Sequence, residues 1–176
     1  MFDPYNGHEY VDLGLPSGTL WAKCNVGAET ETDYGLYFQW GDTQGYTADQ
    51  VGTDKAFTWN DYKYGVFDEE DPDWGMTKYN STDGKTTLDI TDDAARVNMG
   101  GEWHMPTYEQ ALELENLSKD FTTISGVYGV QITGNNGNTL FIPWAGAAVN
   151  NRLNSGLGRI STATLAGNMY DSCWYY

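Results

Sequence analysis

Two β-forming runs separated by a short turn sequence constrain the fold of this chain more than any other feature. The runs are GVYGVQIT (126–133) and TLFIPWAG (139–146), and GNNGN lies between them. Apolar and β-branched residues on both sides of a Gly/Asn-rich turn predict a β-hairpin. Phe141 and Ile142 make the second strand apolar, so we expect it to be buried. The segment that follows this strand is therefore attached to the core.

A second feature is the amphipathic sequence PTYEQALELENLS. Thr107, followed three residues later by a glutamine, forms a capping box, which marks the first turn of an α-helix. Ala111, Leu114 and Leu117 then form an apolar stripe at helical spacing. The sequence predicts a helix with one face buried in the core.

A shorter helix is predicted upstream, in the sequence TDDAARVNMGG. We expect Thr91 to be its N-cap, since a threonine oxygen can accept a hydrogen bond from the first turn. Asp92 and Asp93 then lie in the first turn, where the helix dipole favours acidic side chains. Gly100 is expected to end the helix.

The N-terminal half is predicted to be built of short strands and turns. Residues 9–40 contain short apolar runs punctuated by glycine and proline, and Trp21 is expected to anchor one of them in the core. The sequence YGLYFQWGD (34–42) predicts a further strand. Residues 42–87 are polar, aromatic and irregular, and include the acidic run DEEDPDW (68–74). We interpret 42–87 as a long irregular insertion held in place by its aromatic side chains.

Length favours one domain spanning residues 1–176, with or without a long insertion, and the predicted strands and two helices make it an α+β domain. Hydrophobic residues make up 40% of the chain and there are 7 Trp, which is enough for a packed core. The 21 Gly and 13 Tyr favour short strands and turns over long helices. The sequence contains no apolar run long enough to cross a membrane, and its start does not resemble a signal peptide.

The charge excludes two classes of partner. The formal net charge is −16 at pH 7, so the chain repels nucleic acid and anionic membrane surfaces. We therefore expect no nucleic-acid partner, and the lack of a long apolar run leads us to expect no membrane insertion.

Metal and redox sites are not predicted. Cys24 and Cys173 are the only cysteines, and the sequence leaves open whether they form a disulfide or remain separate thiols. His8 and His104 are too scattered to complete a zinc motif. The acidic run 68–74 could supply oxygens to Ca²⁺, but it lacks the spacing and central glycine of an EF-hand, so a solvated loop is favoured. We expect no bound metal and no cofactor.

No catalytic arrangement stands out. Ser161 and Ser172 lack the glycines of a nucleophile elbow, and Cys173 has no basic neighbour in the sequence. His104 could act as a general base, although its position beside Trp103 favours a packing role. A glycosidase pair of carboxylates meets only in space, and no two acids stand out here. We therefore expect a protein that is not an enzyme.

The C-terminal segment 147–176 differs in composition from the rest of the chain. It is rich in Asn, Ser, Gly and Tyr, and it contains two basic residues, Arg152 and Arg159, and one acidic residue, Asp171. Such residues are used by adaptable binding surfaces, because rings supply contact area and small polar groups supply hydrogen bonds. The apolar residues expected to fasten this segment to the domain are Leu153, Leu157, Ile160, Leu165 and Trp174. Because these residues attach the segment to the domain, a flexible tail is excluded. Two interpretations stay open: a structural β-ending and a recognition surface.

Several motifs together resemble a known family. They are EYVDLGLPSGTLWAKCNVGA (9–28), YGLYFQWGD (34–42), the stretch 85–114 and GNTLFIPWAG (137–146). In this order they are similar to the major paralogous domain described from Fibrobacter and common in Bacteroidetes surface proteins. GGEWHMPTYEQ also resembles a segment of formylglycine-generating enzymes. The resemblance implies the C-type-lectin-like fold, with mixed twisted antiparallel strands, two helices and long irregular insertions.

The enzymatic activity of formylglycine-generating enzymes is not implied. That chemistry uses a late pair of cysteines to bind copper, whereas Cys173 is the only late cysteine here. In addition, His104 stands where that family often has arginine, and Leu112 stands where it has tryptophan.

The C-type-lectin-like fold is also used by variable proteins of diversity-generating retroelements, in which selected codons of the C-terminal segment are rewritten. Gly146, Leu153 and Gly158 match framework positions of such proteins, among substituted polar positions. The resemblance implies ligand contacts by exposed residues of the segment, which are Val149, Asn150, Asn151, Arg152, Asn154, Ser155, Leu157, Arg159, Asn168, Tyr170, Asp171, Ser172 and Tyr175.

These features together predict a ligand-binding domain, displayed on a bacterial surface or a phage particle, that recognises a protein or a surface glycan. The alternative is a structural module of a cell-surface protein or adhesin, in which the C-terminal segment only completes the sheet.

Overall fold

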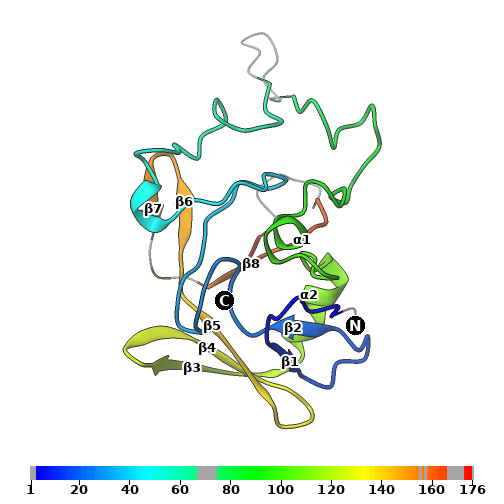
Figure 1. Cartoon of the computed structure of the whole chain (residues 1–176), viewed down its shortest axis with the longest axis vertical. Helices are drawn as coiled ribbons and strands as arrows, with labels where there is room; N and C mark the ends of the chain where they lie inside the picture. The colour runs from blue at the N-terminus through cyan, green and yellow to red at the C-terminus, as the bar shows by residue number, and fades with distance from the viewer. Residues whose placement is uncertain (1–2, 67–74, 155, 157, 166–172, 176) are drawn as a thin grey trace.

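The computed structural model describes residues 3–66, 75–154, 156, 158–165 and 173–175 (Figure 1). The fold is α+β, as predicted, with two α-helices and several small antiparallel sheets. In chain order the elements are β1 (Tyr10–Asp12), β2 (Leu20–Ala22), the 3-10 helix η1 (Ala48–Gln50), α1 (Ala94–Met99), α2 (Tyr108–Glu115), β3 (Ser118–Ile124), β4 (Val127–Thr133), β5 (Thr139–Pro143), β6 (Ala147–Val149), β7 (Arg152–Asn154), β8 (Arg159–Ser161) and β9 (Cys173–Tyr175).

The largest sheet has the strand order β3-β4-β5, and β1–β2, β6–β7 and β8–β9 are separate two-stranded sheets. The predicted hairpin is confirmed, because β4 and β5 pair antiparallel with Val130 opposite Ile142. Strand β3, which pairs with the other side of β4, was not predicted. Its sequence SKDFTTI lacks a run of apolar residues, so the sequence offers no sign that the sheet extends in this direction.

The helix over 108–115 is confirmed with its capping box. Thr107 accepts a hydrogen bond from the backbone N–H of Gln110, whose side chain in turn accepts one from the N–H of Thr107. Ala111 and Leu114 are fully buried, and Leu117 follows just beyond the helix at 8% exposure. The apolar stripe therefore faces the core, as expected.

The N-cap predicted for the shorter helix was wrong. Asp93, not Thr91, caps α1, and its carboxylate accepts hydrogen bonds from the N–H groups of Arg96 and Met105. Aspartate is at least as good an N-cap as threonine, and here it fixes a second chain segment as well. Asp92 then precedes the helix and points into a different polar cluster. Gly100 ends the helix with φ 73°, as predicted.

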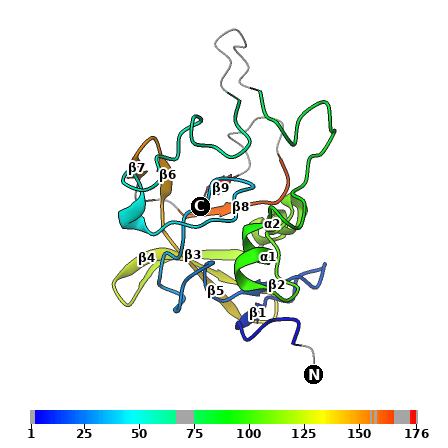
Figure 2. The same cartoon turned by 45° about the horizontal axis from the view of Figure 1, so that its top comes forward.

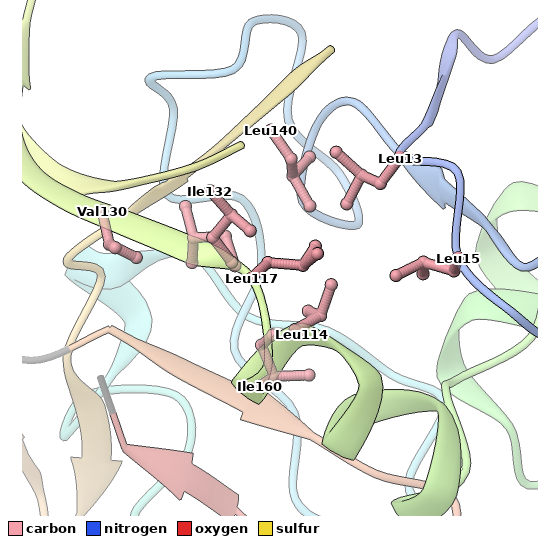
Figure 3. Packing of buried hydrophobic residues seen from close by; sticks show 9 residues of the cluster. Leu13, Leu15, Leu114, Leu117, Val130, Ile132, Leu140 and Ile160 are labelled. Carbon is pink, nitrogen blue, oxygen red and sulfur yellow. The ribbon is translucent and has the colours of Figure 1, made fainter. Parts of the chain in front are cut away.

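The main core lies between the sheet, α2 and the N-terminal segment (Figure 3). Leucines from all three regions converge there with Val130 and Ile132 of β4. Ile160 of β8 joins the same cluster at 9% exposure, and Trp21 packs against its edge, half-buried. The described part of the C-terminal segment is therefore fastened to the core by an apolar residue, as the sequence indicates.

Segment 34–42 is not the strand that its sequence predicts. It contains one isolated bridge, between Tyr37 and Tyr46, and no ladder. Side chains hold it instead: the Tyr37 hydroxyl donates to the carbonyl of Ala145 (2.8 Å), and the indole N–H of Trp40 donates to that of Thr162 (2.9 Å). The apolar alternation therefore serves contacts to the C-terminal segment rather than strand pairing.

The described parts of residues 42–87 lie above the sheet in these views, and η1 lies beside the β6–β7 hairpin (Figures 1 and 2). Their regular structure consists of η1 and isolated bridges. None of the helices in the described residues is both long and apolar enough to span a bilayer.

Candidate ligand-binding site

The β6–β7 hairpin carries the first half of the predicted site, and its turn is set by the backbone. Asn150 and Asn151 form the two-residue loop, with φ values of 48° and 61°. Two successive left-handed residues define the type I′ turn, whose twist matches that of a hairpin. Asparagine is among the few residues other than glycine that adopt this conformation readily. The two asparagines therefore have a structural role in addition to any role in binding.

The turn rests on the chain that precedes it by almost a hundred residues. The N–H of Asn151 donates to the carbonyl of Ala56 (2.7 Å), and that of Asn150 donates to the carbonyl of Phe57 (3.2 Å). Gly52 allows the two segments to approach closely, because a β-carbon at this position would collide with the carbonyl oxygen of Asn151. Segment 52–57 is therefore the platform of the hairpin turn.

Asp61 shapes this platform. Its carboxylate accepts hydrogen bonds from the N–H groups of Ala56 (2.9 Å), Phe57 (3.1 Å) and Thr58 (2.7 Å). Burial opposes ionisation of Asp61, but the hydrogen bonds from Thr58 and the nearby Lys55 outweigh it and hold its pKa below the usual range. An ionised Asp61 thus holds Phe57 in a left-handed conformation, with φ 53°, and turns its carbonyl toward the hairpin.

The side chains of the hairpin divide between two faces. Val149 lies directly opposite Arg152, and Ala147 lies opposite Asn154. Because alternate residues of a strand share a face, Val149, Arg152 and Asn154 lie together on one face. All three are exposed, whereas Leu153 on the other face is half-buried. We call Val149, Arg152 and Asn154 the hairpin face.

The charges of the molecule set Arg152 apart. Every lysine forms an ion pair: Lys23 with Glu9, Lys55 with Asp42 and Asp61, Lys63 with Asp92, Lys78 with Asp89 and Asp92, Lys85 with Asp89, and Lys119 with Glu115. The side chain of Arg152, in contrast, is exposed and has no ion pair or hydrogen bond with any residue that the structure describes. Its guanidinium donors are available to an external acceptor.

A pocket of about 630 Å³ extends between the hairpin and the N-terminal segment. Aromatic walls come from Trp21, Tyr37 and Trp40, and Val149 and Arg159 of the C-terminal segment also line it. Its volume falls in the range of small-molecule and side-chain binding pockets. Burial raises the pKa of Tyr37 to about 12, so its hydroxyl stays neutral and continues to donate to Ala145. The pocket brings Val149 and Arg159 to one cavity.

The opposite side of the insertion is held by a buried carboxylate. Asp92 is 4% exposed and accepts hydrogen bonds from Lys63 (2.9 Å), Lys78 (2.5 Å) and the hydroxyl of Tyr79 (2.6 Å). Burial acts to raise the pKa of Asp92, but the hydrogen bonds, led by that from Lys78, hold it well below the usual range. We call Asp92, Lys63, Lys78 and Tyr79 the Asp92 cluster.

The predicted site residues fall into four groups. Val149, Asn150, Asn151, Arg152 and Asn154 are exposed on one hairpin, and Arg159 is half-buried in the pocket wall. Tyr175 belongs to β9, which pairs with β8 through Arg159, and only its backbone is described. Ser155, Leu157, Asn168, Tyr170, Asp171 and Ser172 lie outside the described residues.

Several other candidate residues can also be placed. His104 is exposed at the pocket, with Nδ1 at 2.9 Å from the carbonyl oxygen of Met105. Cys24 is a half-buried free thiol, whereas the acidic run 68–74 lies outside the described residues. Within the described ranges, three or more His, Cys, Asp or Glu side chains do not gather in a way that could hold a metal ion.

The sequence-based prediction missed the residues that position the hairpin. Gly52 and Asp61 lie in the insertion, which the sequence marks only as irregular. The sequence FTWND offered one signal, because an aspartate a few residues after a threonine can accept several backbone N–H groups. Nothing in the sequence links that loop to residues 150–151.

A search against family models finds no match, and neither curated proteins nor solved structures yield one.

Proposed function

We propose that this chain is a non-catalytic ligand-binding domain whose C-terminal segment contacts the ligand. The observation that supports this most strongly is that backbone groups hold the β6–β7 hairpin in place, while its outward side chains are exposed. Its shape depends on main-chain hydrogen bonds from Asn150 and Asn151, while Val149, Arg152 and Asn154 are exposed on one face. A surface built this way can change its side chains with little effect on the fold.

The hairpin face has the chemistry of a recognition surface. Arg152 supplies hydrogen-bond donors with no acceptor among the described residues, Asn154 supplies an amide, and Val149 is an exposed apolar residue at 42%. The adjacent pocket adds aromatic walls for a ring or an apolar side chain. This combination suits a protein or a surface glycan, bound through arginine hydrogen bonds and aromatic contacts rather than through calcium.

We also propose a family for this chain. The motifs of residues 9–146 resemble those of C-type-lectin-like domains in Bacteroidetes surface proteins, and the α+β architecture with two helices is compatible with that fold. On this basis we propose a variable protein of a diversity-generating retroelement, displayed on a bacterial surface or a phage particle. The genomic test is a nearby reverse transcriptase gene with a near-copy of the codons for 147–176 that differs at adenines. Differences spread over all bases would contradict this origin.

A structural module without a variable site is the second candidate, and one observation favours it. The type I′ turn accounts for Asn150 and Asn151 without any ligand. The two candidates differ in the role that they give to the exposed residues Val149, Arg152 and Asn154. A binding domain needs these side chains for contact with its ligand, whereas a structural module does not.

A surface-displayed library that randomises Val149, Arg152 and Asn154 tests the proposed function. We expect it to yield clones that bind a chosen protein probe, such as serum albumin, and that lose binding when the three positions are reverted. A matched library at Glu29, Glu31 and Thr32 serves as the control, because these residues lie outside the candidate segment and none of them is buried. Equal yields from both libraries, or general unfolding of the first, would favour the structural module.

A further inference from the structure

The outer edge of strand β3 is exposed, and it is long for this molecule. β3 spans 7 residues and pairs with β4 in continuous register, without a bulge. The opposite edge strand of the same sheet, β5, is buried at Leu140, Phe141 and Ile142. Within the described chain, β4 is the only strand that pairs with β3. Exposed edge strands of this length are templates for pairing with another strand.

The turn between β3 and β4 determines which backbone groups face outward. Ser125 and Gly126 form a two-residue loop with φ values of 50° and 83°, which closes on the pair Ile124 and Val127. The closing pair of such a hairpin is hydrogen-bonded, and hydrogen-bonded pairs alternate along the ladder. The N–H and C=O groups of Phe121 and Thr123 therefore point away from β4.

An aromatic patch lies at the middle of this edge. Phe121 is 68% exposed and Tyr128 on β4 is 66% exposed. Both rings contact Trp144, with ring centroids 6.0 Å and 6.3 Å from its own. Tyr128 shares a sheet face with Val130, so this face is covered by the core at one end and open at the other. Figures 1 and 2 show the open end extending away from α2.

The centre of β3 lacks the usual protection of an edge strand. Natural edges are blunted by prolines, bulges, charged side chains or short length. Lys119 and Asp120 precede Phe121, but threonines follow it, and the strand contains no proline. The strands of the small sheets are shorter, at 3 residues each.

We propose that β3 is a homodimer interface, in which it pairs antiparallel with β3 of a second copy and Phe121 lies opposite Phe121. In this register Lys119 lies opposite Thr123 and Asp120 lies opposite Thr122, so no like charges are directly opposed. A register centred on Lys119 would oppose two lysines, and one centred on Thr123 would run into the turn at Ser125. The register centred on Phe121 is thus the one that pairs all 7 residues of β3 without directly opposing like charges, and in it the two Phe121 rings join the aromatic patches of both copies.

Charge sets the strength of this dimer. Each copy carries a formal net charge of −16, and the two Asp120 carboxylates are diagonal neighbours across the paired strands. Both effects oppose association at low ionic strength and are screened as salt is added. The dimer should therefore tighten with salt, unlike one that depends on interfacial ion pairs.

Cross-linking of the full chain tests the register. In a hydrogen-bonded antiparallel pair the Cα atoms are about 5.5 Å apart, which is within the range of a disulfide. We expect Phe121→Cys to form a covalent dimer under mild oxidation. Thr123→Cys is the matched control, because its two copies would be offset by four residues, or about 13 Å. The proposal would be overturned if neither variant cross-linked more than the wild-type chain. It would also be overturned if Thr123→Cys cross-linked and Phe121→Cys did not.

Sedimentation equilibrium at rising NaCl concentration tests the interface without a covalent trap. Phe121→Glu should raise the dissociation constant at least about tenfold, whereas Phe121→Tyr should leave it within about twofold. Asp120→Asn should lower it at low salt. Far-UV circular dichroism confirms that each variant folds. A wild-type chain that stays monomeric at high salt, or a dimer unaffected by Phe121→Glu, would overturn the proposal. Neither result bears on the proposed ligand site, which shares no residue with this edge.

Discussion

The β6–β7 hairpin and the Asp92 cluster fix neighbouring parts of the chain in opposite ways. The hairpin is held through main-chain groups, with the N–H groups of Asn150 and Asn151 bonded to the 56–57 carbonyls, while its outward side chains are exposed. The Asp92 cluster is held through side chains that converge on one buried carboxylate. Substitution should therefore be tolerated on the hairpin face and not in the cluster.

This contrast separates two functions of the insertion. One part, around Asp61, presents backbone carbonyls to the candidate site, and another part, around Lys78 and Tyr79, attaches the insertion to the domain. The candidate site thus depends on residues distant in sequence, although none of them need contact a ligand.

The largest expected effect is that of Asp92→Asn. Loss of the carboxylate leaves Lys63, Lys78 and the Tyr79 hydroxyl around a neutral amide, and should lower the free energy of unfolding by about 3 kcal/mol. Urea unfolding measures this loss. Asp89→Asn is the matched control, because Asp89 pairs with lysines at a more exposed position and should cost less than about 1 kcal/mol. Equal losses would mean that the buried position of Asp92 does not matter.

Acid should weaken the protein through the same carboxylate. The native pKa of Asp92 is depressed, so the unfolded state takes up a proton first as the pH falls. This contribution is complete above the unfolded pKa, about 3.9, and is lost as the pH falls from there toward the native pKa. Unfolding free energies between about pH 5 and pH 3 should fall more steeply for the wild type than for Asp92→Asn. Parallel curves would contradict the role of Asp92.

Gly52→Ala should damage the platform of the hairpin by about 2 kcal/mol, because the new β-carbon collides with Asn151 at a positive φ of 83°. Gly84→Ala isolates the collision. Gly84 also has a positive φ, 64°, but a β-carbon there would meet no atom within 4 Å. It should lose about 1 kcal/mol, from backbone strain alone. Similar melting temperatures for the two variants would show that the turn does not rest on Gly52.

At the turn itself, Asn151→Val should cost about 1 kcal/mol, since a β-branched residue disfavours the left-handed conformation. Asn151→Gly should be neutral within about 0.5 kcal/mol, because glycine accepts this conformation without strain. Thermal unfolding distinguishes the two. If the glycine variant loses as much as the valine variant, the asparagine side chain, and not the backbone, stabilises the turn.

The sequence predicted the parts of the fold that depend on local rules. The capping box at Thr107 and the hairpin around 134–138 follow from residues a few positions apart, and both are confirmed. The N-cap at Thr91 was wrong because three adjacent residues can each cap a helix, and the choice was made by a distant contact of Asp93 with Met105.

The predicted strand at 34–42 failed for a related reason. The alternation of apolar residues marks contact with other segments, but it does not say whether the contact is made by a backbone ladder or by side chains such as Tyr37 and Trp40. In the candidate site, composition selected the exposed hairpin residues, while the platform at Gly52 and Asp61 could not be inferred because it depends on a contact between distant loops.

The free energy of unfolding of the triple variant Val149→Thr, Arg152→Thr and Asn154→Thr tests the division between backbone and side chains most directly. Threonine keeps a good propensity for strands, and the three side chains are exposed. We expect the value to stay within about 0.5 kcal/mol of the wild type. A loss of more than about 2 kcal/mol would show that these side chains hold the fold, and would contradict their assignment to recognition.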